Sequence, residues 1–186
     1  MNAKLLPSLL SLAAVTVCLV GNAQGQQRQP GQYAPRHSGF WFSAGLGYGS
    51  LGCQNCGSRE GGASGNLSLG GTLSQNWLLG VSSNTWFKSQ SGSTLTVNAF
   101  TAAMRFYPSA TGRFFLIGGL GLGTVSANVS GVGSGSQTGF GALLGLGYDV
   151  RMGPKVSLTP YWNGFAMSSS NSNANVGQIG LGITVR

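Results

Sequence analysis

Charged side chains are scarce in this sequence. Only 6% of the residues are charged, and just two of them, Glu60 and Asp149, are acidic. A protein surface in water normally carries many more charges, whereas a surface in contact with lipid carries few. The ten basic residues give a net charge of +8 but are scattered along the chain. Because nucleic-acid binding needs a basic patch, the composition argues against a nucleic-acid partner.

Residues suited to catalysis or metal binding are scarce as well. His37 is the only histidine, and one of the three cysteines, Cys18, lies in the N-terminal apolar segment. A serine nucleophile needs a base and usually an acid, and a structural zinc site needs about four ligands. His37 precedes the first expected strand, at the opposite end of the fold from Glu60. The sequence therefore predicts no enzymatic activity, no catalytic residue, no metal site and no cofactor.

Long apolar runs are absent, with one exception at the N-terminus. The run Leu5–Val20 follows the single charge of Lys4 and is followed by small residues at 21–23. This order is typical of a signal peptide, and the run is shorter than the about 20 residues of a membrane-spanning helix. We expect residues 1–23 to be cleaved. A lipoprotein signal at Cys18 is the alternative, but Val17 stands where a small residue is expected.

The rest of the chain contains no apolar run that would span a bilayer as a helix. Backbone polar groups in lipid must be paired within helices or closed sheets. An exported chain of this kind is therefore either a β-barrel or a soluble secreted β-protein. Residues 24–38 are rich in Gln, Pro and Arg and are expected to form a flexible periplasmic lead-in. Residues 39–186 are expected to form the folded domain.

Strict alternation of large apolar with small or polar residues marks four segments. They are Phe40–Gly49, Phe114–Gly123, Gly139–Val150 and Ile179–Val185. A period of two is typical of a strand with one apolar face. Weaker alternation covers residues 63–73, 77–87, 94–107 and 156–167. In 94–107, Leu95 and Val97 fall out of phase with Phe100, which predicts a bulge near Asn98.

Eight segments with alternating connection lengths predict an all-β fold, an antiparallel up-and-down transmembrane β-barrel of eight strands. The short connections are 74–76, 108–112 and 152–155, and the longer ones are 50–62, 88–93, 126–137 and 168–173. Short turns are expected in the periplasm and longer loops outside the cell. An even number of strands places both chain ends in the periplasm.

Three stretches resemble the outer-membrane β-barrel domain family, the small barrels related in architecture to OmpA and OmpX. They are Gly39–Gly49, Arg105–Gly123 and Gly141–Arg151. The resemblance covers residues 39–186 and implies a place in the outer membrane of a Gram-negative cell envelope. It says almost nothing about activity, because these stretches are the membrane-spanning strands. Such barrels usually end in an aromatic residue that is recognised during assembly, whereas this sequence ends Ile183–Arg186.

Two groups of residues are candidates for a special role. Cys53 and Cys56 lie in the first long connection, and an exported protein favours a disulfide between them. A redox or metal role is the alternative. Asp149, Arg151 and Arg105 are expected to form an interior polar cluster near the periplasmic end. Such a cluster either pairs buried charges or gates a narrow passage. Glu60 is expected to pair in solvent with its neighbour Arg59.

The predicted function is a structural or surface-interaction role in the outer membrane. The expected partners are outer-membrane lipids, lipopolysaccharide and an extracellular molecule bound through the long loops. A porin-like channel or transporter for small solutes is the alternative. Because side chains normally fill a barrel of about eight strands, the first role is preferred.

Overall fold

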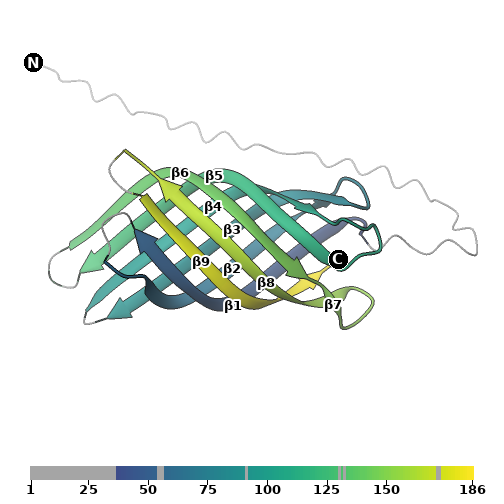
Figure 1. The fold of residues 1–186 in the computed structure, drawn as a ribbon, viewed down its shortest axis with the longest axis horizontal. Helices are drawn as coiled ribbons and strands as arrows, with labels where there is room; N and C mark the ends of the chain where they lie inside the picture. Colours follow the sequence, from purple (N-terminus) through teal and green to yellow (C-terminus); the bar gives the residue numbers. More distant parts are fainter. Residues whose placement is uncertain (1–36, 54–56, 91, 130, 132, 171–172) are drawn as a thin grey trace, which may run out of the picture. The chain divides into compact units, whose positions relative to one another are not determined.

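The computed structural model describes residues 37–53, 57–90, 92–129, 131, 133–170 and 173–186, which form a single sheet of antiparallel strands (Figure 1). The strands are β1 (Phe40–Cys53), β2 (Glu60–Thr72), β3 (Trp77–Gln90), β4 (Ser93–Phe106), β5 (Phe114–Val129), β6 (Gly133–Tyr148), β7 (Val150–Arg151), β8 (Val156–Ser168) and β9 (Asn173–Val185). The predicted signal peptide and nearly all of the lead-in lie outside the described residues, so those two assignments stay predictions.

Within the described part of the chain, no helix is long and apolar enough to cross a membrane.

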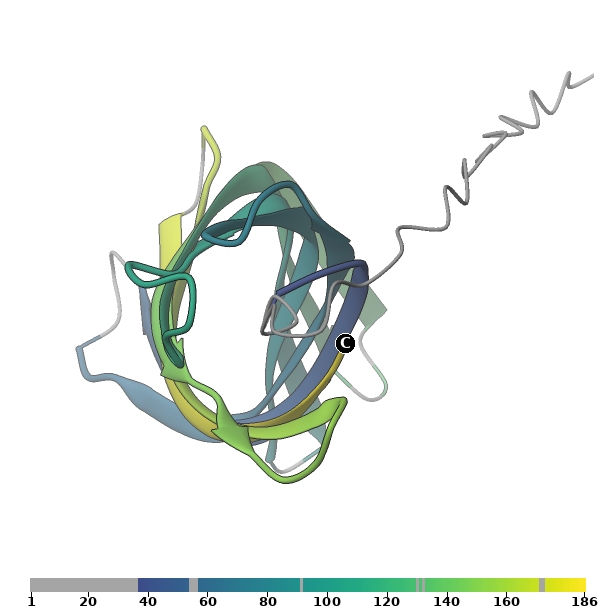
Figure 2. The same cartoon turned by 90° about the vertical axis from the view of Figure 1, so that its right-hand side faces the viewer.

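The sheet closes on itself, because β1 pairs with β9 as well as with β2. Viewed along the axis, the strands form a complete ring (Figure 2). β7 continues β6 after a break at Asp149, and the register against β8 is kept, from Gly147 opposite Tyr161 to Val150 opposite Leu158. In this register the unpaired residues Tyr148 and Asp149 lie across from Pro160 and Thr159, and Pro160 has no N–H to donate. The predicted eight-stranded barrel is confirmed, with β6 and β7 sharing one crossing.

The stagger of the strands sets the width of the barrel. A row of paired residues can be followed from strand to strand around the barrel, starting at Phe140 and passing through Phe100 and Ile183. It returns to the starting crossing at Val150, ten residues further along, and this offset is the stagger. Barrels of about eight strands with such a stagger have an interior just wide enough for side chains. The interior of the barrel is therefore filled mainly by buried side chains.

The predicted alternation sorts side chains between the two faces of the wall. In β1, Leu46 is 78% exposed and points outward, whereas Trp41 is 1% exposed and points inward. The same alternation holds in β5, β6 and β9. Outward positions carry large apolar residues, including Phe100, Leu144 and Ile179. So large an exposed apolar surface is unfavourable in water but is what a lipid bilayer requires. We call this surface the apolar band.

The predicted bulge near Asn98 is wrong. β4 pairs without interruption with β3, from Gln90 opposite Ser93 to Trp77 opposite Phe106, and its register with β5 is equally continuous. Leu95 and Val97 point inward like the rest of the odd-numbered residues, and Val97 is buried. The alternation looked broken because the barrel interior itself becomes apolar at that end, so an inward position there no longer carries a polar residue.

The predicted long loops are wrong in length. β5 and β6 pair all the way to Val129 opposite Gly133, which turns most of the expected loop at 126–137 into a hairpin. Outward residues of this extension are Ser, Thr and Asn, so they show no apolar alternation. Gly92 and Gly131 adopt positive φ values of 78° and 83° at the hairpin tips, where a side chain would be strained.

The extension lies at one end only. We call the end where β1 finishes the loop end, and the end where β1 begins and β9 finishes the terminal end. At the terminal end the apolar band reaches the strand termini, at Phe40, Phe106 and Val185, whereas at the loop end the strands continue beyond it. Strands that extend past the lipid are typical of the extracellular side of such barrels.

Candidate functional site

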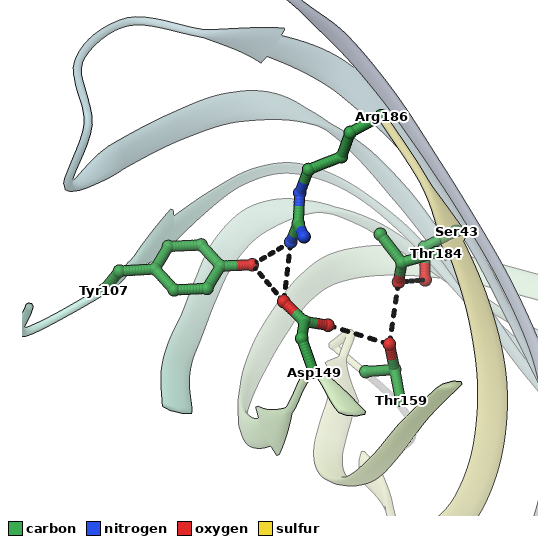
Figure 3. Close-up of polar contacts among 6 residues, drawn as sticks. All are labelled: Ser43, Tyr107, Asp149, Thr159, Thr184 and Arg186. Carbon is green, nitrogen blue, oxygen red and sulfur yellow. Dashed lines mark hydrogen bonds and ion pairs between the residues drawn. The ribbon is translucent and has the colours of Figure 1, made fainter. Parts of the chain in front are cut away.

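The carboxylate of Asp149 organises the interior at the terminal end. It occupies the gap between β6 and β7 and is buried. One oxygen accepts hydrogen bonds from the Arg186 guanidinium at 2.6 Å and from the Tyr107 hydroxyl at 2.8 Å (Figure 3). The other oxygen accepts a hydrogen bond from the Thr159 hydroxyl at 2.8 Å. We call Tyr107, Asp149, Thr159 and Arg186 the ionic cluster.

Hydroxyl groups extend the ionic cluster across the barrel closure. Thr184 of β9 hydrogen-bonds Thr159 of β8 at 2.9 Å and Ser43 of β1 at 3.0 Å (Figure 3). These hydrogen bonds therefore connect β8, β9 and β1, the strands at which the barrel closes.

Burial raises the pKa of the Tyr107 phenol, and the neighbouring Asp149 carboxylate raises it further. Tyr107 therefore remains a protonated donor at neutral pH.

The interior cluster expected from the sequence is rearranged. Arg105 is buried, and its guanidinium carbon lies 4.2 Å from the ring centre of Trp41 and 4.7 Å from that of Phe115, distances suited to cation–π contact. Arg151 is exposed at the mouth, so it does not belong to the buried group. The ion pair of Asp149 is with Arg186, which sequence reasoning did not assign to the cluster.

A layer of uncharged amides fills the middle of the barrel. The side-chain oxygen of Asn84 accepts hydrogen bonds from Asn66 at 3.0 Å, Asn163 at 3.1 Å and Gln178 at 2.9 Å. These residues come from β2, β3, β8 and β9, so the bonds cross the lumen. All four side chains are buried. These hydrogen-bonded amides therefore form a layer that lies across the axis of the barrel.

The loop end of the interior is closed by apolar side chains. The largest is Trp86, which is fully buried and donates from Nε1 to the carbonyl of Gly49 at 3.1 Å. Its companions are Leu51, Val97, Phe165, Met167 and Val176. We call these six residues the apolar plug. Between the plug and the ionic cluster, a cavity of about 10 Å³ beside Arg105 has room for about one water molecule.

The remaining residues singled out in the sequence lie elsewhere. Cys53 ends β1 at the loop end, and Cys56 lies outside the described residues, so the disulfide stays a prediction. Glu60 does not pair with Arg59. Instead, Lys88 Nζ lies 2.5 Å from its carboxylate, because β2 and β3 are adjacent. His37 stacks on the Tyr107 ring, with centroids 3.9 Å apart. No group of three or more potential metal ligands occurs among the described residues.

Comparison with known proteins identifies the fold. No protein-family model and no curated protein sequence matches the chain. It is similar to the crystal structure of neisserial surface protein A, with 18% identity and a TM-score of 0.62 over 80% of this chain and 97% of that one. It is also similar to Ail, the attachment invasion locus protein of Yersinia pestis, with 16% identity and a TM-score of 0.60 over 80% of this chain and 99% of that one. The fold is that of the small outer-membrane β-barrels, as the sequence predicts.

Proposed function

We propose that this chain is an integral outer-membrane barrel that acts through its surface at the loop end and does not conduct solutes. The observation that carries the proposal is the filled interior. The ionic cluster, the amide layer and the apolar plug follow one another along the axis, and each joins buried or largely buried side chains from distant parts of the chain. A solute would have to break the hydrogen bonds of two layers and displace Trp86 from the third.

The surface that supports an interaction role is the outward face of the loop-end extension. Its members are Thr94, Thr96, Thr124, Ser126, Asn128, Ser134, Ser136 and Thr138, from β4, β5 and β6. All eight side chains are uncharged and carry hydroxyl or amide groups. Such a face suits a partner rich in hydroxyl groups, such as the sugar chains of lipopolysaccharide or the surface of another cell. One of the similar barrels is Ail, the attachment invasion locus protein of Yersinia pestis, and its name is consistent with this role.

Conductance across a planar bilayer tests the closed interior. Pure, folded protein is expected to give no stable unitary current steps, because side chains block the lumen at three levels. Insertion is verified separately by a gel shift between unheated and boiled samples, since a closed barrel without free strand edges resists detergent. Reproducible unitary steps from verified, inserted protein would favour the channel over the surface role.

A further inference from the structure

The side chain of Arg59 lies on the outside of the barrel wall, fixed by three hydrogen bonds. Nε donates to the Ser50 hydroxyl at 2.9 Å, Nη1 donates to the Asn175 side-chain oxygen at 2.9 Å, and Nη2 donates to the Ser50 carbonyl. Ser50 belongs to β1 and Asn175 to β9, so the guanidinium bridges the closure of the barrel. Gly52 leaves the space that the Arg59 side chain occupies, because a Cβ added at Gly52 would lie only 2.7 Å from Nη1.

Arg59 has no acidic partner among the residues that the structure describes. Glu60, the nearest acid in sequence, is paired with Lys88, and Asp149 is buried in the ionic cluster at the terminal end. A guanidinium carries five N–H donors, and the three hydrogen bonds use three of them. Arg59 therefore presents a positive charge, held in one place and with unused N–H donors, at the edge of the apolar band nearest the loop end.

A shallow groove on the lipid-facing wall begins at Arg59. Its volume is about 420 Å³. Small residues of β6, β8 and β9 form its floor, namely Ala142, Gly164, Ala166 and Gly177. Leu144 and Trp162 rise beside it and are exposed. The groove is thus apolar except at the loop end, where Arg59 and Asn175 line it.

We propose that Arg59 and this groove bind a phosphate-bearing lipid of the outer leaflet, with the phosphate on the guanidinium and an acyl chain in the groove. A groove within the apolar band faces lipid, so an acyl chain is the occupant that matches its surroundings. The planar guanidinium fork matches phosphate oxygens, and such charge-assisted bonds are about twice as strong as neutral ones. The inference rests on membrane insertion of the barrel but not on a closed lumen.

Lipid titration of folded protein tests this site. The protein is prepared in zwitterionic detergent, and bound lipid is counted by native mass spectrometry with bisphosphorylated lipid A, dephosphorylated lipid A and phosphatidylglycerol as separate probes. Arg59→Gln is expected to weaken binding of bisphosphorylated lipid A about tenfold or more, because the substitution removes the charge-assisted hydrogen bonds to the phosphate. Arg113→Gln, an exposed arginine at the terminal end, is the matched control and should bind as the wild type does.

Gly164→Leu tests the groove separately from the charge. A Cβ at this position would have no neighbour closer than 3.6 Å, so the fold should accept the side chain while the groove is filled. We expect weaker binding of lipid A with Arg59 intact. Comparison of lipid A with phosphatidylglycerol shows which phosphate-bearing lipid is preferred. Equal binding by wild type and Arg59→Gln, or equal binding of phosphorylated and dephosphorylated lipid A, would overturn the proposal. Failure of the wild type to insert would instead contradict the proposed function.

Discussion

Replacing Asp149 with Asn is expected to cost about 3 to 5 kcal/mol of unfolding free energy, the usual result of removing one partner from a buried ion pair. The carboxylate accepts hydrogen bonds from Arg186, Tyr107 and Thr159. An amide in its place offers one oxygen, and its NH₂ group faces donors. Arg186 is then left largely buried without a counter-charge. Urea unfolding of the protein folded into lipid vesicles measures the loss.

The second acid of the chain provides the matched control. Glu60→Gln removes an ion pair whose two side chains are 48% and 32% exposed, and surface pairs of this kind contribute about 0 to 1 kcal/mol. A double-mutant cycle with Asp149→Asn and Arg186→Gln should show strong coupling, since the second substitution removes the charge that the first leaves unpaired. If Asp149→Asn costs no more than Glu60→Gln, the ionic cluster does not stabilise the terminal end.

Trp86→Ala is expected to cost about 3 to 5 kcal/mol, the usual range for truncating a large buried aromatic residue. Trp86 is completely buried in the apolar plug, and Gly49 and Gly62 leave the space that its ring occupies. The substitution creates a cavity and removes the hydrogen bond to Gly49. Unfolding in lipid vesicles measures this loss too.

Trp162→Ala is the matched control for this substitution. Trp162 is 43% exposed on the lipid-facing wall, where acyl chains can fill the space that the ring leaves. We expect a clearly smaller loss of stability. Trp86→Ala should also remain non-conducting, because the amide layer and the ionic cluster still block the axis. Equal losses at the two tryptophans would contradict the assignment of Trp86 to a packed interior.

The membrane-spanning part of the fold was predictable because lipid imposes a pattern on sequence. An outward residue within the band must be apolar, so segments such as Phe40–Gly49 and Ile179–Val185 show their strand structure directly. Outside the band this requirement ends. Ser126 and Ser136 are paired neighbours in the β5–β6 hairpin, yet nothing in their residue type distinguishes a solvated strand from a loop.

The partners of the interior residues were harder to predict. The sequence shows that Asp149 needs a cation, but Arg105, Arg151 and Arg186 all lie at the same end of the barrel. Only the closure of β9 against β1 and β8 brings Arg186 to the carboxylate. The amide layer does have a signal in the sequence. Asn84 and Gln178 occupy inward positions of their strands, where an apolar residue could also pack.

Accessibility of single cysteines tests the central claim, a filled barrel in a bilayer, most directly. With Cys53 and Cys56 replaced, one cysteine is placed at each of three outward positions, Leu144, Ile179 and Leu181, and three inward positions, Leu143, Val176 and Thr184. A fluorophore at an outward cysteine should be quenched by a lipid-phase nitroxide. An inward cysteine should react with neither a lipid-phase nor a water-soluble maleimide, because packed side chains surround it. Rapid labelling of inward cysteines by the water-soluble reagent would contradict the filled interior, and equal labelling of outward and inward cysteines by the lipid-phase maleimide would contradict the barrel itself.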